Sequence, residues 1–200
     1  MAAETEKDNE RANLTRQTRK KNLTHNTIMH HAKRLFEEKG IGNVTIEEIA
    51  EAADVSRSTF FSHFATVEAL LTEIAGVAIE DILREKKESG KKGIQGIIVL
   101  MNKLIEDTCP YPHLTAELLS NGIMKSKGKS PFYYFENVIY NEIKAEGASG
   151  KMYTYKEQAA LIMGAYFGLI YQRLIKGESF NRPEDIKRTM RKFINSFTGG

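Results

Sequence analysis

The chain has 200 residues, of which 41% are hydrophobic and 28% are charged, and its formal net charge is +3. This composition supplies enough apolar side chains for a packed core. A single cysteine excludes an intramolecular disulfide and, with no apolar leader at the polar N-terminus, favours a cytoplasmic location. The stretch 159–171, the longest without strongly polar residues, is shorter than the roughly 20 residues of a membrane span, so we expect no membrane partner.

Charge is distributed unevenly over the first quarter of the chain. Between Arg11 and Arg34 there are seven basic residues and no acidic one, whereas residues 35–54 carry six acidic residues and Lys39 as their one base. This division indicates one surface that faces an anion and another that faces solvent. A solvated tail beside ordinary helix charges is the alternative interpretation.

The first predicted elements are an arm and a helix. Residues 1–21 are expected to form a flexible basic arm, because their charged sequence lacks a hydrophobic rhythm. From Asn22 onward, apolar residues such as Ile28 and Phe36 recur at helical spacing, and Gly40 provides a natural C-terminal cap.

Two short helices joined by a tight turn are predicted within residues 45–64. Thr45 and Glu48 have the spacing of a capping box, which opens the first helix. Ser56 caps the second helix, and Asp54 tolerates the left-handed backbone that a tight corner needs. This arrangement matches a helix-turn-helix, whose second helix enters the major groove of DNA.

The second of these helices carries polar side chains that suit base and phosphate contacts. Arginine makes paired hydrogen bonds to guanine. Serine and threonine bind bases or phosphates, and a preceding basic segment pairs with phosphates. The predicted DNA-binding residues are Thr45, Arg57, Ser58, Thr59, Phe61, Ser62, His63, Lys20 and Lys21.

Helical periodicity, interrupted by glycine and proline residues, predicts six further helices. No segment alternates with period two for long enough to indicate a strand, so we expect an all-α fold of about nine helices. The predicted ranges are 66–88, 91–108, 113–125, 131–146, 152–176 and 182–197.

The last two predicted helices have the features of a dimer interface. Small residues recur every four positions in the range 152–176 and form a smooth stripe on which another helix packs closely. The alternative is that they accommodate bulky neighbours within the same subunit. The predicted interface residues are Ala160, Gly164, Gly168, Met190, Phe193 and Phe197.

Aromatic and apolar residues between these ends suggest an effector pocket. Such pockets are mostly apolar and often lie between helices, although aromatic residues at helical spacing also form ordinary core. The candidate pocket residues are Met101, Leu104, Ile105, Phe135, Tyr166 and Phe167.

Residues 28–71 contain a specific pattern of apolar and polar residues. It reads Ile28-x3-Ala32-x2-Leu35-Phe36-x2-Lys39-Gly40, then Val44-Thr45-Ile46-x2-Ile49-Ala50-x2-Ala53-x-Val55-Ser56, then Thr59-Phe60-x2-His63-Phe64-x3-Glu68-x-Leu70-Leu71. This pattern resembles the DNA-binding domain of the TetR family of regulators. The resemblance implies a three-helix DNA-binding domain at 22–70. It also implies a helical domain at 71–200 that binds a small effector and dimerises through its last two helices.

The resemblance also implies roles for single residues. Arg57 and Ser58 would face bases, whereas Thr59 and His63 would contact the DNA backbone. Phe61 and Val67 stand where the family often has tyrosine and lysine, so two phosphate contacts are expected to be missing.

These features predict a homodimeric transcription regulator on a palindromic operator of double-stranded DNA, a repressor that a small apolar effector releases. A DNA-binding regulator controlled by a protein partner is the alternative. An enzyme with a Cys109 nucleophile is a third hypothesis, but Pro110 and Pro112 exclude a regular helix between Cys109 and His113. We therefore expect no catalytic residue, metal site or cofactor.

Overall fold

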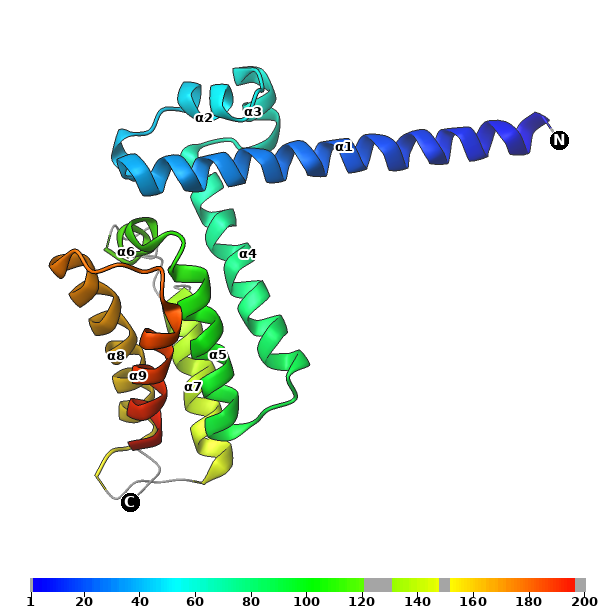
Figure 1. Cartoon of the computed structure of the whole chain (residues 1–200). Helices are drawn as coiled ribbons and strands as arrows, with labels where there is room; N and C mark the ends of the chain where they lie inside the picture. Colours follow the sequence, from blue (N-terminus) through cyan, green and yellow to red (C-terminus); the bar gives the residue numbers. More distant parts are fainter. Residues whose placement is uncertain (1, 121–130, 148–151, 197–200) are drawn as a thin grey trace. The chain divides into compact units, whose positions relative to one another are not determined.

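The computed structural model describes residues 2–120, 131–147 and 152–196 (Figure 1). Within these ranges it contains nine α-helices, one short 3-10 helix and no strand, so the predicted all-α class is confirmed. The chain divides into two compact units, Met1–Leu70 (the N-terminal unit) and Leu71–Gly200 (the C-terminal unit). Over the described part of the chain, no helix is long and apolar enough to cross a bilayer.

The first helix, α1 (Ala2–Lys39), is much longer than its hydrophobic pattern predicts. The structure differs here from the flexible arm expected at residues 1–21. That segment contains no glycine or proline and is rich in alanine, glutamate, lysine and arginine, which are good helix formers. Because a formed helix adds residues far more easily than it nucleates, the packed segment after Asn22 extends toward the N-terminus.

The N-terminal unit is held together by one apolar face from each of three helices. After α1, the 3-10 helix Ile41–Asn43 leads into α2 (Ile46–Ala52) and α3 (Arg57–His63). Gly40 ends α1 with φ of 80°, as its predicted capping role requires. The fully buried side chains of this unit include Ile28, Ala32 and Phe36 of α1, Ile49 of α2 and Phe60 of α3.

The C-terminal unit is a bundle of helices. It contains most of α4 (Val67–Glu88), then α5 (Gly93–Thr108), α6 (Pro112–Ser120), α7 (Pro131–Glu146), α8 (Tyr155–Lys176) and α9 (Pro183–Ser196). Figure 1 shows α5, α7, α8 and α9 side by side; α7 packs on α5 and α8, and α9 packs on the same two helices. Their facing side chains form one large apolar core.

The predicted helix ranges need small corrections, each with a local cause. The helix predicted from residue 152 begins at Tyr155, because Thr154 and Glu157 form a capping box. The helix predicted at 113–125 begins at Pro112 and is described to Ser120; residues 121–125 lie outside the described residues.

Carboxylates of α7 hold the start of α5. The backbone N–H of Gly93 donates to Glu142 Oε2 and that of Ile94 donates to Glu146 Oε2, each at a distance of 2.7 Å. Acidic groups are favourable at a helix N-terminus, where the first N–H groups have no partner within the helix. Gly93 has φ of 57°, a left-handed value that strains most other residues, and a Cβ built there would displace the Glu146 carboxylate.

Candidate nucleic-acid interface and ligand cavity

The start of α2 is fixed by the predicted capping box, which the structure confirms. The backbone N–H of Glu48 donates to Thr45 Oγ1 over 3.2 Å, and that of Thr45 donates to Glu48 Oε2 over 2.8 Å. Lys39 at the end of α1 donates to the other Glu48 oxygen over 2.7 Å. This bond from Lys39, with further bonds from Thr45, lowers the pKa of Glu48 to about 2, so the carboxylate stays ionised.

The turn between α2 and α3 has the predicted left-handed corner. Asp54 has φ of 53°, the one positive value for a non-glycine residue in the ranges that the structure covers. The N–H of Val55 donates to the Ala50 carbonyl over 2.9 Å and closes the turn. The short aspartate side chain makes this backbone tolerable where many such turns use glycine.

Helix α3 has one buried side and one exposed side. Ser56 caps it by accepting from the Thr59 N–H over 3.0 Å. Phe60 is fully buried in α3, and Phe64 is buried directly after it. The predicted DNA-binding residues Arg57, Ser58, Phe61 and Ser62 are exposed on α3, and Thr59 and His63 are half-buried there.

Arg57 makes two contacts that the sequence did not predict. Its guanidinium pairs with Glu47 Oε1 over 2.5 Å and lies 5.5 Å from the ring centre of Phe61. Both partners are exposed, and an exposed ion pair contributes about 1 kcal/mol at most. The contacts therefore orient the arginine side chain without holding it firmly, and they give Phe61 a role in supporting Arg57.

His63 faces a second histidine from α1. The Nδ1 atoms of His25 and His63 are 3.3 Å apart, and the His25 ring stacks on Phe64 with centroids 4.4 Å apart. Burial, followed by the positive charges of His25 and Lys21, lowers the pKa of His63. The neutral imidazole is thus favoured in the free protein. Because His25 and His63 are 38 positions apart, no local pattern pointed to this pair.

The remaining predicted DNA-binding residues lie at helix surfaces. Thr45 is exposed at the start of α2, and Lys20 and Lys21 are exposed on α1. Val67 is the first residue of α4 and is half-buried, so it is not a core residue. Thr66 caps α4 by accepting from the Ala69 N–H over 3.1 Å.

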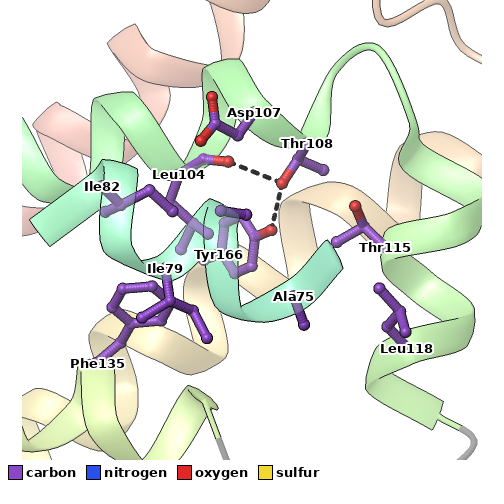
Figure 2. Close-up of a pocket in the computed structure, with 11 residues that line it drawn as sticks. Ala75, Ile79, Ile82, Leu104, Asp107, Thr108, Thr115, Leu118, Phe135 and Tyr166 are labelled. Carbon is purple, nitrogen blue, oxygen red and sulfur yellow. Dashed lines mark hydrogen bonds between the residues drawn. The ribbon is translucent and has the colours of Figure 1, made fainter. Parts of the chain in front are cut away.

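An apolar cavity of about 90 Å³ lies within the C-terminal unit (Figure 2). Leu104, Phe135 and Tyr166, three of the six candidate pocket residues, line it. Sequence reasoning missed the residues that α4, α5 and α6 add. These lining residues are Ala75, Ala78, Ile79, Ile82, Asp107, Thr108, Thr115 and Leu118.

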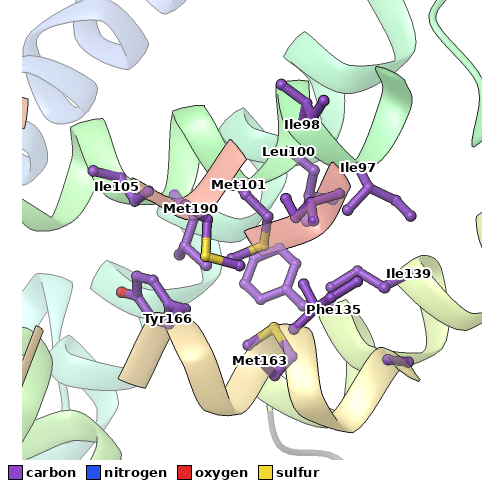
Figure 3. Packing of buried hydrophobic residues seen from close by; sticks show 14 of the residues in the cluster. Ile97, Ile98, Leu100, Met101, Ile105, Phe135, Ile139, Met163, Tyr166 and Met190 are labelled. Carbon is purple, nitrogen blue, oxygen red and sulfur yellow. The ribbon is translucent and has the colours of Figure 1, made fainter. Parts of the chain in front are cut away.

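The other three candidate pocket residues do not line this cavity. Met101 and Ile105 are fully buried in the apolar core, which Figure 3 shows together with Phe135 and Tyr166. Phe167 packs against the edge of that core, with its ring centre 5.5 Å from that of Tyr166. These three residues therefore contribute to packing around the cavity.

The predicted dimer residues divide between an exposed face and the core. Ala160, Gly164 and Gly168 are exposed on α8, and a Cβ built at either glycine meets no atom within 4 Å. Phe193 is half-buried beside Gly168 in a shallow groove between α8 and α9. Met190 instead is buried in the protein's own core, because it faces inward from α9. Phe197 lies outside the described residues.

Cys109, the residue considered as a nucleophile, is not activated as a thiolate. Cys109 is half-buried, and this burial raises the pKa of its thiol, which favours the less nucleophilic protonated form. Across the described ranges, no three histidine, cysteine, aspartate or glutamate side chains gather as metal ligands would.

Comparison with known proteins identifies the N-terminal unit. Residues 28–74 match the model of the family described as bacterial regulatory proteins, tetR family. Over these residues the chain is similar to that family. A curated TetR-type relative, the HTH-type transcriptional regulator TcmR of Streptomyces glaucescens, is 29% identical over 126 residues, which are 50% of this chain and 54% of TcmR. The chain thus matches about half the length of that relative.

Solved structures share the fold over most of the chain. A transcriptional regulator from Aquifex aeolicus VF5 has a TM-score of 0.65 at 22% identity, covering 86% of this chain and 98% of its own. The complex of SmeT with triclosan has the same TM-score of 0.65 at 13% identity, covering 84% and 90% of the two chains. At these identities the likeness establishes the fold only.

Proposed function

We propose that this protein is a TetR-type DNA-binding transcriptional repressor, active as a homodimer on a palindromic operator and released by a small apolar effector. The observation that carries the proposal is the two-sided helix α3. Phe60 and Phe64 anchor one side, while Arg57, Ser58 and Ser62 project from the other. A recognition helix needs this division, because one side must hold the scaffold while the other enters the major groove.

The proposed contacts follow from the side-chain chemistry of the N-terminal unit. Arg57 and Ser58 read base edges at the first turn of α3. Thr59 and His63 contact phosphates, together with Thr45 at the start of α2. Lys20 and Lys21 on α1 supply mobile positive charge. In this proposal residues 22–70 form the DNA-binding domain, which acts in the cytoplasm.

Dimerisation is proposed through the exposed face of α8 and the neighbouring part of α9. Ala160, Gly164 and Gly168 leave this face smooth, and Phe193 offers an apolar edge beside it. A two-fold dimer would present two α3 helices to two half-sites of a palindrome.

The cavity supports control by a small molecule over control by a protein partner. The cavity is mainly apolar and is lined by side chains from five helices of one unit, as suits a small ligand, whereas a protein partner would need a broad exposed surface. SmeT, which shares the fold, has been solved with triclosan bound. Helix α4 lines the cavity at Ala75 and Ile79 and begins four positions after His63, the last residue of α3. A ligand that shifts α4 would therefore change the spacing of the two α3 helices and lower operator affinity.

The test is selection of genomic DNA fragments that the purified protein retains, followed by fluorescence anisotropy with the selected fragment. We expect a dimer-sized complex on a pseudo-palindromic site, with affinity at least about a thousand times that for shuffled DNA. Retention of no particular sequence would contradict the proposal. Repression is tested by placing the selected site before a reporter gene; increased expression would instead identify an activator.

A further inference from the structure

Few of the residues that line the cavity are polar, and each polar side chain has a defined partner. Among the lining residues, four have polar side chains: Asp107, Thr108, Thr115 and Tyr166. The others are alanine, leucine, isoleucine and phenylalanine, which offer no hydrogen bond to a ligand. The specificity of the cavity for polar groups therefore depends on which of these four side chains has a proton to donate.

The hydrogen bonds between Thr108 and Tyr166 have a defined direction (Figure 2). Thr108 Oγ1 lies 2.8 Å from the Leu104 carbonyl, which only accepts, so the single hydroxyl proton of Thr108 goes there. Tyr166 Oη lies 2.6 Å from Thr108 Oγ1, so Tyr166 donates and Thr108 accepts. Burial raises the pKa of Tyr166, which keeps its hydroxyl protonated.

The other two polar side chains also have no proton to offer. Thr115 Oγ1 donates to the Tyr111 carbonyl over 2.9 Å, in the preceding turn of its own helix region. Asp107 is an acceptor, and Lys103 donates to it from one helical turn away over 2.9 Å. Among the polar groups of the lining, Tyr166 and the two threonines thus have oxygen lone pairs but no uncommitted proton, and Asp107 is a carboxylate.

We propose that this cavity selects neutral ligands that donate a hydrogen bond, and that it discriminates against carboxylates and against ligands that only accept. The proposal rests on the effector role of the cavity given above. A donor would bond to Tyr166 Oη, while an anion would meet lone pairs and the Asp107 charge. At about 90 Å³ the cavity is smaller than the engineered cavity of about 150 Å³ that holds benzene, so binding of a single ring requires its walls to move apart.

The first test compares two isomers, 4-methylphenol and methoxybenzene, by calorimetric titration of the full-length protein. They share composition and apolar ring, but only the phenol donates. We expect the phenol to bind about 3- to 10-fold more tightly, the range for one net hydrogen bond, and benzoate to bind more weakly than either. Tighter binding of methoxybenzene or of benzoate would overturn the proposal and leave the effector cavity standing.

The second test weakens the preference with Thr108→Val. Removing the acceptor frees the Tyr166 proton for a ligand, so methoxybenzene should gain affinity and the preference for the phenol should fall to about twofold or less. Thr115→Val is the matched control, because it removes a hydroxyl from the same cavity and leaves the Tyr166 bond intact. It should preserve the wild-type ratio.

The outcomes separate the proposal from the function on which it rests. If folded Thr108→Val keeps the wild-type ratio of affinities for the two isomers, Tyr166 does not donate its proton to Thr108 as inferred. Binding of none of the three probes to the wild-type protein would overturn both the effector role and the selectivity. Should Thr108→Val fail to fold, the wild-type ratio of the two isomers still decides the proposal.

Discussion

Replacing Gly164 with leucine tests the proposed dimer, because the change should stabilise an isolated protomer but destabilise a dimer that packs through α8. Within a single chain, Gly164 lies on the exposed face of α8, and a Cβ there meets no atom within 4 Å. Leucine is a far better helix former than glycine, so Gly164→Leu should stabilise an isolated protomer by about 0.7 kcal/mol. For a chain of this size that corresponds to a rise in melting temperature of about 2 °C.

The same exchange has the opposite effect if α8 packs against a partner helix. Overpacking a close contact costs about 1–3 kcal/mol, and the two-fold axis repeats the cost in both protomers. The sum of about 2–6 kcal/mol per dimer would raise the dimer dissociation constant at least about 30-fold. The proposed dimer therefore predicts that Gly164→Leu dissociates to monomers at concentrations at which the wild-type protein remains dimeric.

Sedimentation velocity measures the assembly, and melting at two protein concentrations measures the stability. Gly76→Leu is the control, because a Cβ at this α4 position also meets open space but lies away from the proposed seam. It should leave the dimer intact. A monomeric wild type, or a Gly164→Leu protein that remains dimeric and melts higher, would refute the interface on α8.

Three further predictions address the DNA contacts and the fold. Val67→Lys should tighten binding to specific and random DNA alike and steepen the log–log salt dependence by about one unit per subunit; an unchanged slope with lower melting temperature would contradict this. The lowered pKa of His63, caused by burial and by His25 and Lys21, leaves the free imidazole neutral, whereas a phosphate favours the imidazolium. DNA affinity should therefore rise as the pH falls from about 7.5 to about 6, and His63→Gln should abolish that rise; the free energy of unfolding should fall over the same range, because the unfolded chain binds the proton more tightly. Gly93→Ala should lower the free energy of unfolding by about 1–2 kcal/mol in a denaturant titration, because alanine is strained at φ of 57° and displaces a capping carboxylate; wild-type stability would contradict this.

The helix-turn-helix was predictable because its determinants are local. The three-residue spacing of Thr45 and Glu48, the Ser56 cap and the aspartate at position 54 each act within one turn of chain. The structure differs from this local reasoning at residues 1–21, where the lack of a hydrophobic rhythm predicts a flexible arm and the backbone is helical from Ala2. A helix needs no apolar stripe where its residues have high helix propensity and a packed helix follows them.

The cavity and the Arg57 contacts depend on residues that meet only after folding. Tyr166 was a candidate because it is aromatic, but nothing near it in sequence indicates that Ala75 and Thr108 face it. Likewise Glu47 reaches Arg57 across the turn, so neither residue alone predicts the pair. Local signals thus identify elements and caps, whereas the cavity lining depends on how separate helices pack.

The most direct test of the central claim, that α3 reads DNA bases, is the affinity of Arg57→Ala for the selected operator and for random DNA. Fluorescence anisotropy at one fixed salt concentration provides both values. If Arg57 contacts a base, the variant should lose about 1–3 kcal/mol on the operator and much less on random DNA. Equal losses on both would show that Arg57 contacts only phosphate, and no loss on either would contradict the assignment of α3 as the recognition helix.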